Sequence, residues 1–213
     1  MARTKIFLLC LILGWVLASL AQNPVYPQIT VSVRSSPQIS DSQLIDAEKT
    51  ASRVFEKAGI VIRWMNSANR DADTLDVSPA PTDLSVQLLP HSRNLSDDAF
   101  GVSFLDASGG VYADIFLDRV QRLHALDPRI SSSRLLGTVV AHELGHLLLG
   151  QHSHTERGLM QPRWQREELK KIGQGNLLFD PTQSAQLRAR ARVLIDRNTA
   201  AMAAAKSERG GNF

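Results

Sequence analysis

The residues with the most evident chemistry are His142, Glu143 and His146, which stand in the order His-Glu-Leu-Gly-His. On a helix, residues four apart lie on the same face about one turn apart, so the two imidazoles can bind one ion. Glu143 follows the first histidine and can take a proton from a water molecule held beside it. Burying all three side chains without a partner would be costly, which favours a shared metal ion over a chance decoration of the helix. The spacing therefore predicts zinc ligands at His142 and His146, with Glu143 as the catalytic base.

A catalytic zinc site usually has three protein ligands and one open position. Gly150 follows the expected helix and lets the chain turn back, and both His152 and His154 come after it. The residues alone leave either histidine open as the third ligand. A competing geometry takes a glutamate from a later helix, and Glu167 and Glu168 lie at a suitable distance along the chain. Their charged surroundings are explained more simply by a solvated helix with charge pairs.

The pattern resembles that of the metzincin metallopeptidases, H-E-x-x-H-x-x-G-x-x-H followed by a methionine turn. His152 falls at the family's third-ligand position, but Leu149 stands where the family has glycine, and Gly150 comes one residue late. The stretch from His142 to Trp164 also resembles a set of exported bacterial zinc-motif proteins in which a histidine at the place of His154 recurs. This second resemblance favours His154 over His152.

The metzincin resemblance implies further features. Met160, in Gly158-Leu159-Met160, corresponds to the methionine turn, an apolar floor beneath the metal; the alternative is an ordinary buried methionine. The tyrosine that some metzincins use as an extra ligand has no counterpart after Met160. The family lines its cleft with an edge strand, and Val111–Leu117 occupies the matching position, where an exposed edge would bind an extended peptide by strand addition.

Hydrophobic periodicity and helix caps predict the elements that position these residues. The fold class is α+β: a mixed twisted sheet with a helix packed on it, an active-site zinc helix and a C-terminal helix, as in a zincin. The expected strands are Gln28–Arg34, Ile60–Met65, Leu84–Leu89, Gly101–Leu105 and Val111–Leu117, the last two forming a hairpin. The expected helices run from Ser40 or Asp41 to Ala58, from Ser132 to Leu149, and onward from Thr182, with an Asn66–Thr82 surface loop and irregular residues 151–166.

Residues 1–21 have the layout of a secretory signal peptide, with Arg3 and Lys5 before an apolar run and small residues up to Ala21. The run is short for a bilayer span of about 20 residues, which argues against a membrane anchor. Removing this segment also removes Cys10, the single cysteine, and so excludes disulfides and a thiol nucleophile. The predicted domains are 1–21 as signal peptide, 22–178 as zincin-like catalytic domain, and 179–213 as C-terminal helix and basic tail.

Together these features predict a secreted or periplasmic zinc metallopeptidase that hydrolyses peptide bonds with a Glu143-activated, zinc-bound water. The expected cofactor is Zn²⁺ and the expected partner a peptide or protein substrate. The basic tail lacks interleaved aromatic residues, so no nucleic-acid partner is expected, and no stable membrane association once the signal is cleaved. One alternative is a non-catalytic, zinc-stabilised peptide-binding module in which both His152 and His154 coordinate. Another is a hydrolase of non-peptide amides.

Overall fold

The computed structural model of the protein describes residues 26–66, 84–92, 99–106, 109–150 and 153–210. The predicted signal peptide, residues 67–82 of the predicted surface loop, and His152 lie outside the described residues. Cleavage after Ala21 therefore stays a prediction. Within the described part of the chain, no helix is both long and apolar enough to cross a bilayer.

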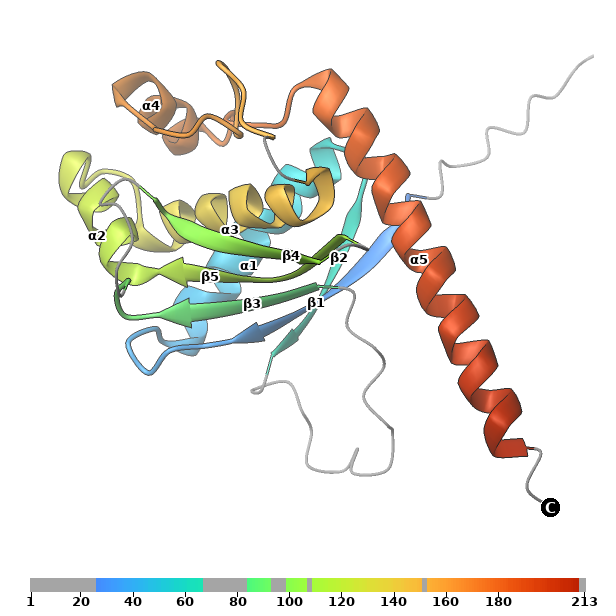
Figure 1. Cartoon of the computed structure of the whole chain (residues 1–213). Coiled ribbons are helices and arrows are strands. Elements are labelled where there is room, and N and C mark those ends of the chain that lie inside the picture. The colour runs from blue at the N-terminus through green and yellow to red at the C-terminus, as the bar shows by residue number, and fades with distance from the viewer. Residues whose placement is uncertain (1–25, 67–83, 93–98, 107–108, 151–152, 211–213) are drawn as a thin grey trace, which may run out of the picture.

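The described residues form five strands and five helices (Figure 1). In chain order they are β1 (Gln28–Arg34), α1 (Asp41–Lys57), β2 (Val61–Asn66), β3 (Leu84–Leu89), β4 (Gly101–Asp106), β5 (Gly109–Phe116), α2 (Leu117–Leu126), α3 (Ser132–Leu149), α4 (Arg166–Gln174) and α5 (Pro181–Gly210). The α+β class with a mixed sheet is thus confirmed.

The strands form one sheet in the order β2-β1-β3-β5-β4. Strands β2, β1, β3 and β5 run parallel to one another, while β4 pairs antiparallel with β5. The predicted hairpin is therefore present, but the prediction that Val111–Leu117 is the edge strand is wrong. That segment lies in β5, between β3 and β4, and Leu117 already begins α2. The edge on this side of the sheet is β4.

Local signals fix the ends of the first and third helices. Ser40 caps α1 with a capping box in which Gln43 returns the hydrogen bond, and Gly59 follows the helix with φ +79°. Ser131 accepts a hydrogen bond from the Arg134 backbone N–H at the start of α3. Hydroxyl caps and a glycine past the helix end are the features that sequence reading relies on, and both helices lie within one residue of their predicted bounds.

Two helices depart from the sequence prediction. The α2 helix follows β5 without a loop, in a stretch to which the sequence prediction assigned no helix. The α4 helix includes the predicted solvated segment, yet Leu169 and Ile172 on it are buried. It is therefore an amphipathic helix that packs on the core and exposes its charged side to solvent.

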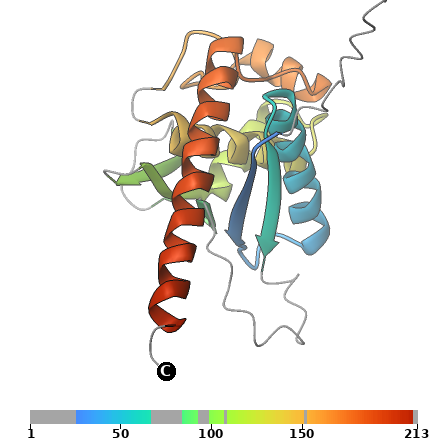
Figure 2. The same ribbon diagram turned by 90° about the vertical axis from the view of Figure 1, so that its right-hand side faces the viewer.

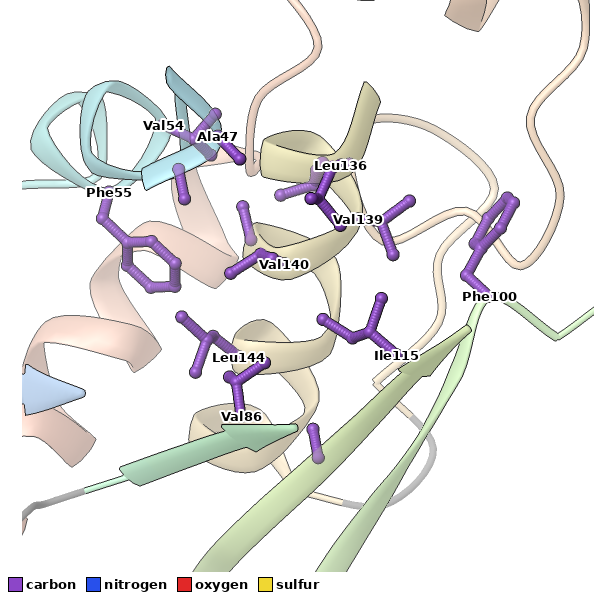
Figure 3. Packing of buried hydrophobic residues seen from close by; sticks show 14 of the residues in the cluster. Ala47, Val54, Phe55, Val86, Phe100, Ile115, Leu136, Val139, Val140 and Leu144 are labelled. Atoms are coloured by element: carbon purple, nitrogen blue, oxygen red, sulfur yellow. The ribbon is translucent and has the colours of Figure 1, made fainter. Parts of the chain in front are cut away.

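Helices α1 and α3 cover one face of the sheet, and the core lies between them and the strands (Figures 1 and 3). In Figure 3, Leu144 of α3 lies above Val86 of the sheet, between Ile115 on its right and Phe55 of α1 on its upper left. The two helices cross closely at Gly137, where an added Cβ would lie 2.3 Å from the Ala47 carbonyl oxygen. This packing buries α3 along nearly its whole length and fixes the helix that carries the His-Glu-Leu-Gly-His pattern.

The C-terminal helix α5 packs on the body only through its first half. Gln183, Ser184, Leu187 and Ala191 are buried, whereas Val193 and Met202 are exposed. Figures 1 and 2 show the second half running past the sheet and away from the body. The predicted boundary after residue 178 stays a prediction, but the start of α5 lies next to the site described below.

Candidate metal centre

Two histidines on α3 converge at one point. The Nε2 atom of His146 lies 3.1 Å from the Nε2 atom of His142, one helical turn earlier. His142 is only 3% exposed, and the rings of Phe100 and Trp164 pack against it. The four-residue spacing thus places the two imidazoles together, as the sequence predicted.

The third histidine at this point is His154, which follows the Gly150 turn. Gly150 ends α3 with φ +90°, a left-handed conformation that favours glycine. The Nε2 atom of His154 then lies 3.1 Å from that of His146. Among the described residues, His142, His146 and His154 offer ligand atoms that all lie within 4.8 Å of one another. His152, the other predicted third ligand, lies outside the described residues.

The outer nitrogens of the two helical histidines have oxygen partners. The Nδ1 atom of His142 lies 2.8 Å from the Leu159 carbonyl oxygen, and that of His146 lies 2.7 Å from Ser153 Oγ. A carbonyl oxygen only accepts, so His142 must donate its Nδ1–H and present a lone pair at Nε2. Such outer hydrogen bonds orient metal-binding imidazoles and fix their tautomer. Sequence reading identified neither partner.

This arrangement fits a zinc ion. Zinc–nitrogen bonds of about 2.0–2.1 Å in tetrahedral geometry separate ligand nitrogens by about 3.3 Å, close to the observed 3.1 Å. Lone pairs that converge at this distance repel one another unless a cation or a proton lies between them. Imidazole nitrogens are typical zinc ligands, and three of them leave room for a further ligand.

The three histidines favour the neutral form that a metal requires. Burial lowers the pKa of His142 to about 3, with a further contribution from the neighbouring His146. Burial also lowers the pKa of His146 to about 4, helped by His154, and lowers the pKa of the more exposed His154. At neutral pH all three imidazoles are therefore in the neutral form, so binding a cation requires no net release of protons from them.

Glu143 is held beside the histidines by the edge strand β4. Ser103 Oγ lies 3.0 Å from Glu143 Oε2 and 3.2 Å from its backbone oxygen, within hydrogen-bond reach of both. Gly101 leaves space for the same side chain, since an added Cβ would lie 2.9 Å from Glu143 Cδ. Burial raises the pKa of Glu143 to about 8, and the hydrogen bond from Ser103 opposes that rise. Sequence reading missed both partners, although small residues at alternate strand positions could have indicated a close approach.

Met160 lies in a tight turn packed against α3. It is fully buried, and a Cβ added to Gly145 would lie 2.7 Å from its Sδ atom. Gly158 opens the turn with φ +83°, and the Leu159 backbone N–H donates to the Leu178 carbonyl oxygen at 2.8 Å. The turn thus places an apolar side chain against the helical turn of His146 and a carbonyl oxygen against His142. The role of a methionine floor stays a prediction.

The histidines and Glu143 open into a cleft of about 370 Å³. The edge strand β4 forms one side of the cleft, and Pro162 lies on another. Phe100 and Trp164 pack with their ring centroids 4.5 Å apart and lie 6.0 and 5.6 Å from the His142 ring. The two rings thus pack against His142, and Phe100 also lines the cleft.

The competing glutamate ligands are not part of this group. Glu168 accepts the Gln165 backbone N–H at 3.1 Å in the α4 cap and lies 3.9 Å from Lys171. Glu167 is exposed on the same helix, beside a separate groove. Glu168 thus has a charge partner on its own helix, as predicted, and Glu167 lies on the exposed side of α4.

No protein-family model and no curated protein matches the chain. Among solved structures, the chain is similar to the crystal structure of archaemetzincin from Methanopyrus kandleri, with a TM-score of 0.46 and 16% sequence identity over 81% of this chain and 99% of that one. A likeness this distant assigns neither a family nor an activity, and the geometry of the metal centre has to carry the functional assignment.

Proposed function

We propose that the protein is an exported, zinc-dependent metallopeptidase. The observation that carries this proposal is the convergence of His142, His146 and His154 beside the buried carboxyl of Glu143, in a cleft bounded by a sheet edge. Each part has a chemical reason: three neutral nitrogens suit zinc, a carboxyl suits proton transfer, and a sheet edge suits an extended peptide.

The chain's residues divide the chemistry between them. His142, His146 and His154 would hold the zinc ion, which when bound supplies Lewis acidity toward the substrate carbonyl and the attacking water. In its carboxylate form, which a neighbouring cation would favour, Glu143 would take the proton of that water as the carbon–oxygen bond forms and pass it to the amine nitrogen as the carbon–nitrogen bond breaks. Ser103 and Gly101 fix the carboxyl for both transfers.

The substrate strand would lie along β4. This edge, rather than the Val111–Leu117 segment expected from the sequence, lines the cleft through Gly101, Val102, Ser103 and Leu105. The backbone groups of β4 that do not pair with β5 can bind an extended peptide by strand addition. A substrate bound there has its backbone next to Glu143, because Ser103 on the same strand touches that side chain.

The direct test measures zinc content and peptide cleavage in the purified protein, the Glu143→Ala variant and the His142→Ala variant. We expect about one zinc per chain in the parent and in Glu143→Ala, with cleavage reduced by about a thousandfold or more in Glu143→Ala. His142→Ala should lose both zinc and activity. Glu167→Ala, an exposed glutamate outside the group, serves as the matched control and should retain both.

Two results would reject the proposal in different ways. A folded parent that binds no zinc from solution would exclude the metal centre itself. Zinc in the parent without cleavage of any peptide mixture, with both His152 and His154 coordinating by X-ray absorption, would support the non-catalytic peptide-binding module. Cleavage of non-peptide amides but not of peptides would mean that the proposed substrate class is wrong and the proposed mechanism is right.

Export is part of the proposal and has its own test. The predicted cleavage after Ala21 would leave a mature chain that begins at Gln22. Sequencing the amino terminus of protein recovered from outside the cytoplasm should give Gln-Asn-Pro-Val. An intact Met-Ala-Arg terminus on cytoplasmic protein would contradict it.

A further inference from the structure

The dipeptide Ser153-His154 contacts both nitrogens of a single imidazole. Ser153 Oγ lies 2.7 Å from His146 Nδ1, while His154 Nε2 lies 3.1 Å from His146 Nε2. Consecutive residues of one loop thus contact the two opposite nitrogens of the His146 ring. The contact with Ser153 differs in kind from that of His142, whose outer partner is a backbone carbonyl.

The tautomer of His142 is fixed. Its Nδ1 must carry the hydrogen that the Leu159 carbonyl accepts, so its Nε2 always presents a lone pair. Since His142 is 3% exposed, water does not readily satisfy this nitrogen, and it needs either a cation or a hydrogen-bond donor. His146 Nε2, 3.1 Å away, can supply that donor.

The two ways of satisfying His142 require opposite tautomers of His146. When a cation is bound, His146 Nε2 presents a lone pair to it, and Nδ1–H donates to Ser153 Oγ. When no cation is bound, His146 Nε2–H donates to His142, and Nδ1 accepts a hydrogen bond from the Ser153 hydroxyl. A carbonyl or carboxylate in place of Ser153 could take part only in the first arrangement, whereas a hydroxyl both donates and accepts.

We propose that Ser153 is a positioning residue that exchanges donor and acceptor roles with His146 when zinc binds. Its hydroxyl keeps the His142–His146 pair hydrogen-bonded in the metal-free protein and orients His146 Nε2 toward the ion in the loaded one. The inference rests on the proposed function, because it requires zinc held by His142, His146 and His154. The exchange lets the protein take up and release zinc without losing its folded structure.

The first measurement is zinc affinity by competition with a chromogenic chelator, on the full-length parent and three variants. Ser153→Ala removes the hydroxyl and should weaken zinc binding by about 10- to 100-fold, the usual cost of losing an outer partner. Ser153→Thr keeps a hydroxyl and should stay within about threefold of the parent. Ser103→Ala, the matched control, removes a hydroxyl that contacts Glu143 rather than a histidine, and should leave zinc affinity unchanged.

The second measurement reads the tautomers directly, through the ¹⁵N shifts of the histidine side chains of the parent before and after zinc is added. His142 should carry its hydrogen on Nδ1 in both states. His146 should carry it on Nε2 in chelator-treated protein and on Nδ1 in zinc-loaded protein. Because this experiment uses the parent, its result holds even where a variant fails to fold.

The two measurements together separate the possible outcomes. Equal zinc affinity of Ser153→Ala and the parent, or a His146 that carries Nδ1–H in both states, overturns the role of Ser153 and leaves the proposed function standing. A parent that binds no zinc overturns both. Weakened affinity in Ser153→Ala, with the tautomer of His146 exchanging in the parent, supports the inference.

Discussion

The two halves of the metal centre are built in different ways. His142 and Glu143 belong to the helix half, on α3, where both are 3% exposed and the helix is packed between the sheet and α1. His154 belongs to the loop half, residues 153–160, and is exposed. The loop half is anchored by the buried Leu159 and Met160 at its end and by hydrogen bonds, such as the 2.8 Å bond from Leu159 N to the Leu178 carbonyl.

This difference indicates how the site would respond to its ion. The helix half is positioned by the core and keeps its geometry whether or not a metal is bound. The loop half gains most from a bound ion, because zinc would add a bond to its exposed residue His154, whereas its buried residues Leu159 and Met160 are already held by the core. Local stability generally follows such differences in burial and contact.

The largest expected effect comes from removing one histidine from each half. His142→Ala should weaken zinc binding by about a thousandfold, since bulk solvent does not reach this buried position to replace the lost ligand. His154→Ala should weaken it by about 100-fold, because solvent reaches the exposed position. Chelator competition measures both. Equal losses would show that the two halves contribute alike and would contradict the comparison.

The second prediction concerns how the stability of the metal-free protein depends on pH through Glu143 of the helix half. Burial raises the pKa of Glu143 from 4.5 to about 8, so the folded chain binds more protons than the unfolded one between these values. Its contribution to stability is therefore full below pH 4.5 and is lost as pH rises toward 8. We expect metal-free Glu143→Gln to gain about 3 kcal/mol over the metal-free parent between pH 5 and pH 8, measured by urea unfolding.

The histidines change stability with pH in the opposite direction to Glu143. Because they are present in both the parent and Glu143→Gln, their contribution cancels when the two proteins are compared. The pKa of His142 falls from 6.5 to about 3 and that of His146 to about 4, so the unfolded chain binds more protons below pH 6.5. Stability is lost in both proteins as pH falls from 6.5 toward these values. A parent and a Glu143→Gln variant with the same pH dependence would mean that Glu143 is not buried as described.

The helix half is also the part that the sequence predicted well. Residues 132–149 carry apolar side chains around most of the helix, Ser131 supplies the cap and Gly150 the end, so local signals suffice to place His142 and His146 together. The partners of Glu143 could not be found this way. Ser103 and Gly101 meet it only because β4 lies beside α3, a contact about 40 residues away in sequence.

The edge strand was mispredicted for a related reason. A hairpin can join a sheet through either of its strands, and the choice depends on which one pairs with a third strand. Here β5 pairs with β3, from Ser85 with Tyr112 to Leu89 with Phe116, which leaves β4 at the edge. Nothing local distinguishes the two strands, so only the assembled sheet decides the side that faces the cleft.

A third prediction compares two glycines, one beside each half of the metal centre: Gly101 contacts Glu143 of the helix half, and Gly150 precedes the loop half. Gly101→Ala should destabilise the protein by about 1–3 kcal/mol and lower activity, because its Cβ would meet the Asp114 carbonyl oxygen at 2.3 Å and press on Glu143. The Cβ of Gly150→Ala would meet nothing within 4 Å, so only the backbone conformation, φ +90° with ψ −172°, is strained, at a cost of about 1–3 kcal/mol. Thermal unfolding measures the loss of stability in both variants. Zinc affinity distinguishes the two variants, because Gly150→Ala should weaken zinc binding by displacing His154.

A Gly101→Ala variant with parental stability and activity would show that β4 does not confine Glu143.

The smallest expected effect tests how the loop half is attached. Thr155 follows His154, accepts a hydrogen bond from the buried Gln183 side chain at 3.1 Å and donates to the Arg157 carbonyl oxygen at 2.9 Å. Thr155→Val removes both hydrogen bonds with little change in side-chain shape and leaves the Gln183 amide N–H without this acceptor. We expect the free energy of unfolding to fall by about 1 kcal/mol and zinc to bind a few times more weakly. Thr138→Val is the matched control on α3, where the hydroxyl donates to the Arg134 carbonyl within the helix at 2.8 Å, and should leave zinc affinity unchanged. Unaltered zinc affinity in Thr155→Val would mean that the hydrogen bond from Gln183 on α5 to the Thr155 hydroxyl does not help to position His154.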